Sequence, residues 1–187
     1  MRIAYILYNG ITTLDFIGIY DPVSRLRSMG FLPDLSWQLC ALQASIKDHI
    51  GLEITVDAIR PDLGGYDAIV VPGGFGSRTL QQDEDFIDWL QTAGKDTLKI
   101  SICTGSLLLG AAGFLEGKRA TSHFAEYRQL ETYANEVLQE RIVEDRGVIT
   151  AGAVAASLDL GLYLCEKWAG KQAMDEIAKS MNYKLVR

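Results

Sequence analysis

The chain has 187 residues, of which 48% are hydrophobic and 22% are charged, and its formal net charge is −6. This length and composition are ordinary for one globular domain, so we expect residues 1–187 to form a single domain. No basic cluster exceeds two residues. We therefore exclude nucleic acid and anionic membrane surfaces as partners and expect a small-molecule substrate.

The sequence shows no sign of export or of membrane insertion. The apolar start ends at Asn9-Gly10, which is too early for a signal-peptide core. The longest apolar stretch, residues 106–115, contains glycines and is far shorter than a membrane span. Three cysteines (Cys40, Cys103 and Cys165) form no CxxC pair. We expect a cytoplasmic protein with free thiols, in which Cys40 and Cys165 belong to the core.

The first half of the chain predicts strands that alternate with helices. In order, we expect a strand over 2–8, a helix over 14–29 capped by Thr12 or Thr13, a strand over 37–42, a small hairpin over 45–56 turning at Gly51, a buried strand over 67–71 and a surface helix over 83–92. The strand over 67–71 is continuously apolar, which is typical of strands buried in a parallel sheet.

The second half continues the alternation. We expect a strand over 99–102, a buried helix over 104–112, a short strand over 119–122, a helical segment over 124–133, a hairpin over 141–151 turning at 145–147, and helices over 154–169 and 171–181. This order is typical of an α/β, flavodoxin-like three-layer sandwich, with a mostly parallel central sheet and helices on both faces. Ligands bind such sheets at the carboxyl ends of the central strands.

Cys103 lies where a predicted strand runs directly into a helix. Ser101 and Gly105 flank it at two residues on either side, and small residues there permit the sharp turn of a nucleophile elbow. The N-terminal end of a helix favours a thiolate. The pattern therefore indicates a cysteine nucleophile, and the alternative is a buried core cysteine.

Two adjacent glycines follow the buried strand, in Pro72-Gly73-Gly74. Such a turn exposes backbone N–H groups. We predict that Gly73 and Gly74 lie beside Cys103, and that the N–H groups of Gly74 and Thr104 form an oxyanion hole. The alternative is a plain turn. Gly74-x-Gly76 lacks the third glycine of a dinucleotide site, and no residues have metal-site spacing, so we expect no cofactor and no metal.

Two further residues could handle protons. Asp15 lies between Leu14 and Phe16, and apolar surroundings would raise its pKa and make it a general acid. The alternative is an aspartate in the first turn of a helix, stabilised by the helix dipole. His123 could assist the cysteine, or it could be structural. His49 lies among polar residues in the predicted hairpin, and we expect it to be solvated.

At these positions the chain resembles the ThiJ/PfpI superfamily, which has the class I glutamine amidotransferase-like fold. The resemblance extends along nearly the whole chain. It rests on Leu14-Asp15-Phe16-x-Gly18, Gly51-Leu52-Glu53-Ile54, Val70-Val71-Pro72-Gly73-Gly74, Ile102-Cys103-Thr104-Gly105-Ser106, the stretch from Leu108 to His123, and Val148-Ile149-Thr150-Ala151-Gly152.

Within that superfamily, the chain most resembles isocyanide (isonitrile) hydratases and the amidase-like domain of AraC-type regulators. Asp15 stands where protease-like and deglycase-like members carry glutamate, and Thr104 replaces the histidine that follows the nucleophile in PfpI-type proteases. The regulator interpretation is disfavoured because the chain ends near Arg187, which leaves no room for a helix-turn-helix domain. Residues 151–156 are less glycine-rich than in the hydratases, and the chain stops before their C-terminal extension.

The resemblance implies that Cys103 is the nucleophile of a lyase and Asp15 its general acid. The leading hypothesis is hydration of an isonitrile to an N-formamide through a thioimidate, without a cofactor. The resemblance also implies a homodimer. Alternatives are a cysteine redox or stress sensor, a non-catalytic ligand-binding protein, a glyoxalase or deglycase, and an amidase or protease-like activity.

Overall fold

The computed structural model describes residues 1–184 and has a seven-stranded central sheet. Its strand order is β10-β11-β7-β6-β1-β2-β5, and every neighbouring pair is parallel except β10 and β11. The strands are β1 (Arg2–Ile6), β2 (Ser36–Ala41), β5 (Ala58–Ile59), β6 (Ala68–Val71), β7 (Leu98–Ile102), β10 (Ile142–Asp145) and β11 (Val148–Ala151). The predicted α/β fold with a mostly parallel sheet is confirmed.

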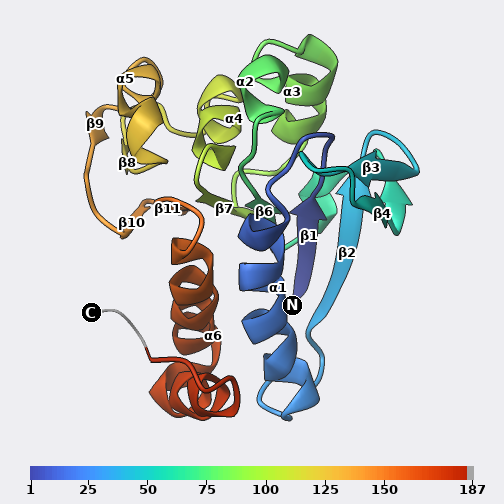
Figure 1. Ribbon diagram of the computed structural model, residues 1–187, viewed down its shortest axis with the longest axis vertical. Coiled ribbons are helices and arrows are strands. Elements are labelled where there is room, and N and C mark those ends of the chain that lie inside the picture. The colour runs from blue at the N-terminus through green and yellow to red at the C-terminus, as the bar shows by residue number, and fades with distance from the viewer. Residues whose placement is uncertain (185–187) are drawn as a thin grey trace.

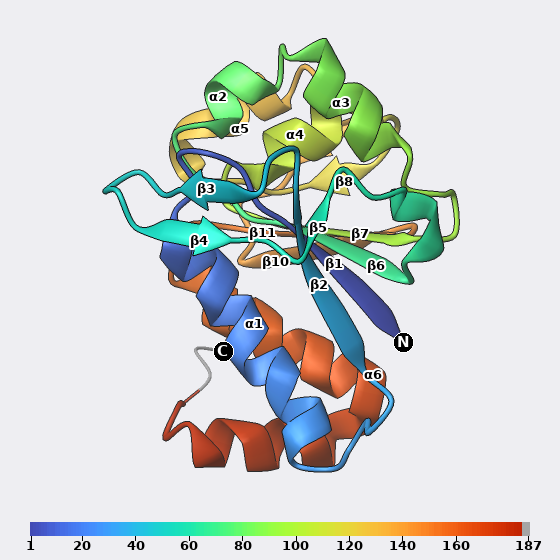
Figure 2. The same ribbon diagram turned by 90° about the vertical axis from the view of Figure 1, so that its right-hand side faces the viewer.

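Helices cover both faces of the sheet (Figures 1 and 2). One face carries α1 (Thr13–Ser28) and α6 (Ala156–Ser180), and the other carries α2 (Ser77–Leu80), α3 (Glu84–Gln91) and α4 (Gly105–Ala111). Gly170 has φ 85° and ψ 169°, which breaks α6 into two helical segments. The sequence predicts this break, since its two final helices end and begin on either side of Gly170.

Small residues bring α1 and α6 close together. A Cβ atom added to Gly161 of α6 would lie 2.3 Å from Cγ of Pro22 in α1, and one added to Gly18 would lie 2.0 Å from Oγ of Ser157. Real Cβ atoms do not make such contacts. The glycine at each crossing therefore allows the two backbones to approach, and this packing holds the first turn of α1 against the sheet.

The shortest elements differ from the predictions. The expected hairpin at 45–56 is present as β3 (Ser45–Lys47) and β4 (Glu53–Thr55), but the expected strand over 119–122 is only β8 (Arg119–Ala120), paired with β9 (Glu136–Val137). The expected helical segment over 124–133 is η2 (Phe124–Glu126) followed by α5 (Tyr127–Leu130). The sequence analysis missed β5, β9, α2 and η1 (Leu63–Gly65), because two to four residues are too few to show a periodicity.

The carboxyl ends of three neighbouring strands meet at one edge of the sheet. Tyr8 lies just beyond β1, Pro72 follows β6 and Cys103 follows β7, and these strands are adjacent in the order β7-β6-β1. The predicted proximity of Gly73 to Cys103 is confirmed. Across residues 1–184, no helix combines the length and apolar character needed to span a membrane.

Candidate active site

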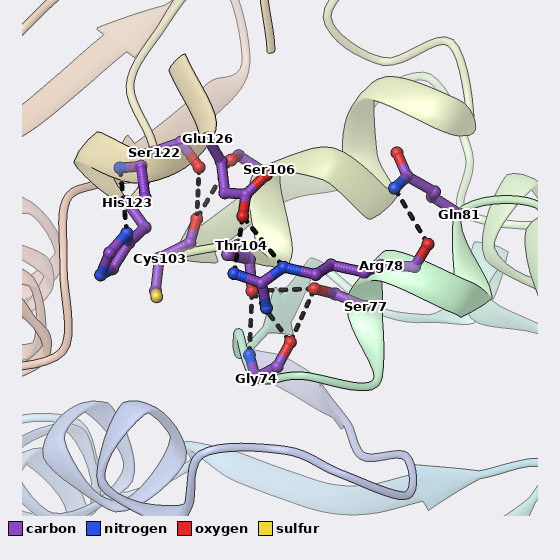
Figure 3. Close-up of polar contacts among 11 residues, drawn as sticks. Gly74, Ser77, Arg78, Gln81, Cys103, Thr104, Ser106, Ser122, His123 and Glu126 are labelled. Carbon is purple, nitrogen blue, oxygen red and sulfur yellow. Dashed lines mark hydrogen bonds and ion pairs between the residues drawn. The ribbon is translucent and has the colours of Figure 1, made fainter. Parts of the chain in front are cut away.

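Cys103 adopts a backbone conformation that few non-glycine residues adopt, with φ 56°. Hydrogen bonds hold this turn on both sides. The Cys103 N–H donates to the carbonyls of Ala151 (3.0 Å) and Gly152 (2.9 Å). Its own carbonyl accepts from the hydroxyls of Ser106 (3.1 Å) and Ser122 (3.0 Å), as Figure 3 shows. The turn has the strained strand-to-helix geometry expected of a nucleophile elbow.

Cys103 is 5% exposed and borders a cavity of ≈ 260 Å³. The other lining residues are Thr12, His49, Gly74, Phe75, Arg78, Thr104, His123 and Val154. A larger cavity, of ≈ 410 Å³, is bordered by Tyr8 and otherwise by residues without a titratable side chain. The cavity at Cys103 is the smaller of the two, and it is the one lined by a cysteine and two histidines.

Asp15 is fully buried in the first turn of α1, and both it and Cys103 lie against Gly73. Its Oδ2 accepts the Gly73 N–H at 3.0 Å, and its Oδ1 is buried without a hydrogen-bond partner. A Cβ atom added to Gly73 would lie 2.8 Å from Asp15 Oδ2 and 2.8 Å from the Cys103 Cβ. Only glycine fits between the carboxyl and the thiol.

Burial raises the pKa of Asp15 to about 6. The Gly73 N–H, the Cys103 thiol and His49 each act against this rise. The apolar neighbours of Asp15 in the sequence predict the same direction of this pKa shift. A carboxyl with this pKa can hold a proton near neutral pH, which is the property required of a general acid.

The helix N-terminus acts on the Cys103 thiol in the predicted direction, but other effects outweigh it. Burial, followed by the negative charge of Asp15, raises the pKa of the Cys103 thiol to about 12. The N–H groups of Thr104 and Val154 lower it, but less strongly. Because the two acids influence each other, Cys103 and Asp15 titrate as a pair that holds one proton across the neutral range.

The Gly74 N–H is not available as an oxyanion donor, which corrects a prediction from the sequence. It donates to Oγ1 of Thr104 at 2.9 Å. The backbone N–H groups that act on the Cys103 sulfur are those of Thr104 and Val154. Val154 was missed because it lies in the turn before α6, 51 positions after Cys103 in the printed sequence, and a valine carries no signal of its own.

The two histidines both border the cavity. His123 stacks on Phe124 with ring centroids 4.2 Å apart, and its Nδ1 accepts the Ala125 N–H at 3.1 Å. Across residues 1–184, no hydrogen bond joins it to Cys103 or to Asp15. His49 is exposed, as expected, but its place at the cavity was not predicted, because the β3–β4 turn folds back over the site.

Arg78 and Phe75 form one wall of the cavity. The sequence offers Phe16, Phe75 and Phe124 as candidate pocket walls, with core packing as the alternative; of these Phe75 borders the cavity, and Arg78 was not predicted. The Arg78 guanidinium lies 5.3 Å from the centroid of the Phe75 ring, and its Nη2 lies 2.6 Å from Oε1 of Glu126. Glu126 therefore neutralises the one arginine of the cavity lining. Across residues 1–184, no group of three or more histidine, cysteine or acidic side chains is placed to hold a metal ion.

The thiol and the acid thus lie together around one shared proton, and the chain that carries them matches a known protein family. Residues 1–167 match the DJ-1/PfpI family. The chain belongs to the DJ-1/PfpI family. It is 31% identical over 185 residues to a protein named isonitrile hydratase from Pseudomonas putida, with 98% of this chain and 78% of that protein covered. The superfamily resemblance noted from the sequence is thereby confirmed.

Two other proteins are similar over almost the whole chain. A solved ThiJ/PfpI family protein from Pseudomonas syringae superimposes with a TM-score of 0.88 at 26% identity, covering 100% of this chain and 76% of that one. The transcriptional regulator GbdR of Pseudomonas aeruginosa is 23% identical over 190 residues, which are 99% of this chain and 51% of the regulator. The proteins that this chain resembles therefore include one named as a hydratase and one named as a transcriptional regulator.

Proposed function

We propose that this protein hydrates a small isonitrile to an N-formamide, with Cys103 as nucleophile and Asp15 as general acid. The observation that carries the proposal is the pairing of these two residues across Gly73, where the buried Oδ1 of Asp15 has no other partner. The similarity to a protein named isonitrile hydratase supports the choice of substrate.

The reaction begins from the one-proton state of the pair. With the proton on Asp15, the Cys103 thiolate attacks the terminal carbon of R–NC and forms the S–C bond. Asp15 then delivers its proton to that carbon, which gives the thioimidate R–N=CH–S–Cys103. The N–H groups of Thr104 and Val154 stabilise the thiolate before attack.

Water completes the cycle. Its oxygen adds to the thioimidate carbon, one of its protons goes to nitrogen, and the C–S bond breaks. Asp15 carries the second proton to the departing sulfur, so that the thiol and the carboxylate are regenerated and R–NH–CHO is released. No electrons are gained or lost, and the step consumes only water.

The free thiols fit the proposed location. Cys40, Cys103 and Cys165 are all unpaired. Unpaired cysteines are typical of a reducing compartment. We therefore place the reaction in the cytoplasm.

We also infer that the protein is a homodimer. Four exposed apolar side chains lie on α1 and on the β3–β4 turn, namely Leu14, Ile17, Ile50 and Leu52. The two segments are joined, because the Thr13 hydroxyl donates to Asp48 Oδ2 at 2.7 Å. An apolar patch of this kind beside a functional site is typical of a surface that another molecule covers, and a second copy of this chain would cover it.

The deciding experiment is a kinetic assay of the purified protein on an aryl isonitrile, methylglyoxal and a chromogenic peptide. We expect formamide from the isonitrile, and a loss of at least about a thousandfold in kcat for Cys103→Ala. Cys40→Ala is the matched control, because Cys40 is buried in β2 away from the cavity.

Other results would support other members of the superfamily. Turnover of the isonitrile by Cys103→Ala near the wild-type rate would contradict the proposal. Loss of methylglyoxal instead would indicate a glyoxalase or deglycase, and peptide cleavage an amidase or protease-like enzyme. With no turnover of any substrate, the gain of two oxygens on Cys103 after peroxide treatment would favour a redox sensor.

A further inference from the structure

A ring of hydrogen bonds links Ser77, Thr104 and Gly74 beneath the site, and the reaction as described does not use it (Figure 3). Ser77 is fully buried at the first position of α2. Its Oγ lies 2.7 Å from the Gly74 carbonyl and 2.8 Å from Oγ1 of Thr104. Thr104 Oγ1 accepts the Gly74 N–H at 2.9 Å and lies 3.1 Å from the Gly74 carbonyl.

The ring is complete in donors and acceptors. Two hydroxyl protons and the Gly74 N–H are the donors, while the Gly74 carbonyl and the Thr104 hydroxyl oxygen are the acceptors. Each donor finds an acceptor without water. Removal of the Thr104 hydroxyl leaves the buried Gly74 N–H without its acceptor. Removal of the Ser77 hydroxyl deletes the hydrogen bond that fixes Thr104 Oγ1 and the Gly74 carbonyl against α2, while the Ser77 N–H still donates to the Gly74 carbonyl at 3.2 Å.

The ring fastens together the two segments that hold the reactive pair. Thr104 immediately follows the nucleophile, and its N–H acts on the Cys103 sulfur. Gly74 immediately follows Gly73, whose N–H donates to Asp15. The ring thus links the segment whose Thr104 N–H donates to the Cys103 sulfur with the segment whose Gly73 N–H donates to the Asp15 carboxylate.

We propose that Ser77 is a positioning residue, which acts through this ring to set how the single proton is divided between Cys103 and Asp15. The proposal rests on the pair named in the proposed function, but its test needs no turnover. Without the Ser77 hydroxyl, Thr104 and Gly73 both hold their partners less well. The thiolate loses more stability than the carboxylate, because Thr104 belongs to the ring whereas Gly73 lies one residue outside it. The proton therefore moves toward Cys103, and the pair also retains it to higher pH.

Other titratable groups face the pair from every side. Tyr8 lies beyond β1, His49 in the β3–β4 turn, Arg78 in α2 and His123 after β8. Burial raises the pKa of Tyr8 well above its usual value, so Tyr8 stays neutral below pH 9. The Ser77 hydroxyl opposes that rise, so its removal leaves Tyr8 neutral as well. The histidines and Arg78 are unchanged in the variants compared below, so they contribute equally to each profile.

The test is the rate at which iodoacetamide alkylates Cys103 between pH 5 and pH 9, followed by intact mass. Cys40 and Cys165 are fully buried and stay unmodified. In the wild type we expect the rate to rise and level off near pH 6, where the pair loses its first proton. Ser77→Ala shifts this inflection upward and lowers the level rate roughly 2- to 13-fold, which corresponds to the loss of one hydrogen bond.

The matched control is Ser101→Ala, since Ser101 is a buried serine of β7 whose hydroxyl has no hydrogen-bond partner. Its profile should follow the wild type. Thr104→Val breaks the same ring from the other side and should shift the inflection in the same direction, which keeps the test available if Ser77→Ala does not fold. The double variant should show little more than the larger single effect, because both changes open one ring.

The inference is overturned if the profiles of Ser77→Ala or Thr104→Val coincide with that of Ser101→Ala. A wild-type profile without an inflection near pH 6, unchanged in Asp15→Asn, also overturns it. These outcomes are distinct from failure of the proposed function, which the absence of formamide would show. If the inflection shifts but the protein hydrates no isonitrile, the positioning role of Ser77 is supported, and the isonitrile is the wrong substrate.

Discussion

The buried carboxyl of Asp15 should make the protein less stable as the pH rises. Its pKa is raised from 3.8 to about 6 in the folded state, chiefly by burial. A group with a raised folded pKa stabilises the fold fully below its unfolded pKa, and this contribution is lost as the pH rises through the folded pKa. We therefore predict that the wild type loses stability between pH 4 and pH 8 because of Asp15, and that Asp15→Asn does not show this loss.

The size of the effect follows from the two pKa values. A rise from 3.8 to about 6 corresponds to about 3 kcal/mol of unfolding free energy. About 2 kcal/mol of this falls between pH 4.5 and pH 8. Asp48 and Asp145 have lowered pKa values, so they act in the opposite direction, but they are present in both proteins and cancel in the difference.

Urea unfolding of the wild type and of Asp15→Asn, followed by tryptophan fluorescence at several pH values, measures that difference. We expect the variant to gain about 2 kcal/mol relative to the wild type from pH 4.5 to pH 8. The asparagine side chain of the variant can still accept the Gly73 N–H, so any constant offset reflects packing of the amide. A difference that does not vary with pH would refute the assignment of a raised pKa to Asp15.

Two further predictions concern the cavity and the exposed patch. Phe75→Leu should lower the preference for an aryl over a cyclohexyl isonitrile roughly 2- to 13-fold in kcat/KM, because Phe75 borders the cavity. Phe124→Leu is the control, since Phe124 is about equally exposed but does not border the cavity. An unchanged ratio in Phe75→Leu would place the substrate elsewhere. Ile50→Lys should convert a dimer to a monomer in light scattering, while Ile59→Lys, on the sheet edge at β5, should not; a wild-type monomer would contradict the dimer.

The sequence was sufficient for the elements whose patterns are local. A continuous apolar run predicts β6, alternation of Ile100 and Ile102 with Ser101 predicts β7, and Gly170 marks the boundary between the last two helical segments. The apolar neighbours of Asp15 predict the direction of its pKa, because burial of the helix face also buries the carboxyl.

The pKa of the Cys103 thiol does not follow from the sequence, for a physical reason. The sequence shows a helix beginning after the cysteine, and a helix N-terminus alone would stabilise the thiolate. It does not show that the cysteine is 5% exposed or that a carboxylate lies across Gly73. Desolvation and the Asp15 charge together outweigh the N–H groups of Thr104 and Val154.

The sequence by itself determined the α/β class, the sharp turn at Cys103 and the apolar surroundings of Asp15, because hydrophobic periodicity, glycines and motif spacing are properties of neighbouring residues. Only the tertiary structure decided which donors serve the site. The Ser77–Thr104–Gly74 ring joins residues that lie 27 and 30 positions apart in the sequence. The Val154 N–H and the place of His49 depend on contacts between segments that lie still farther apart. No local pattern encodes such contacts, since they exist only once parallel strands bring their carboxyl ends to one edge.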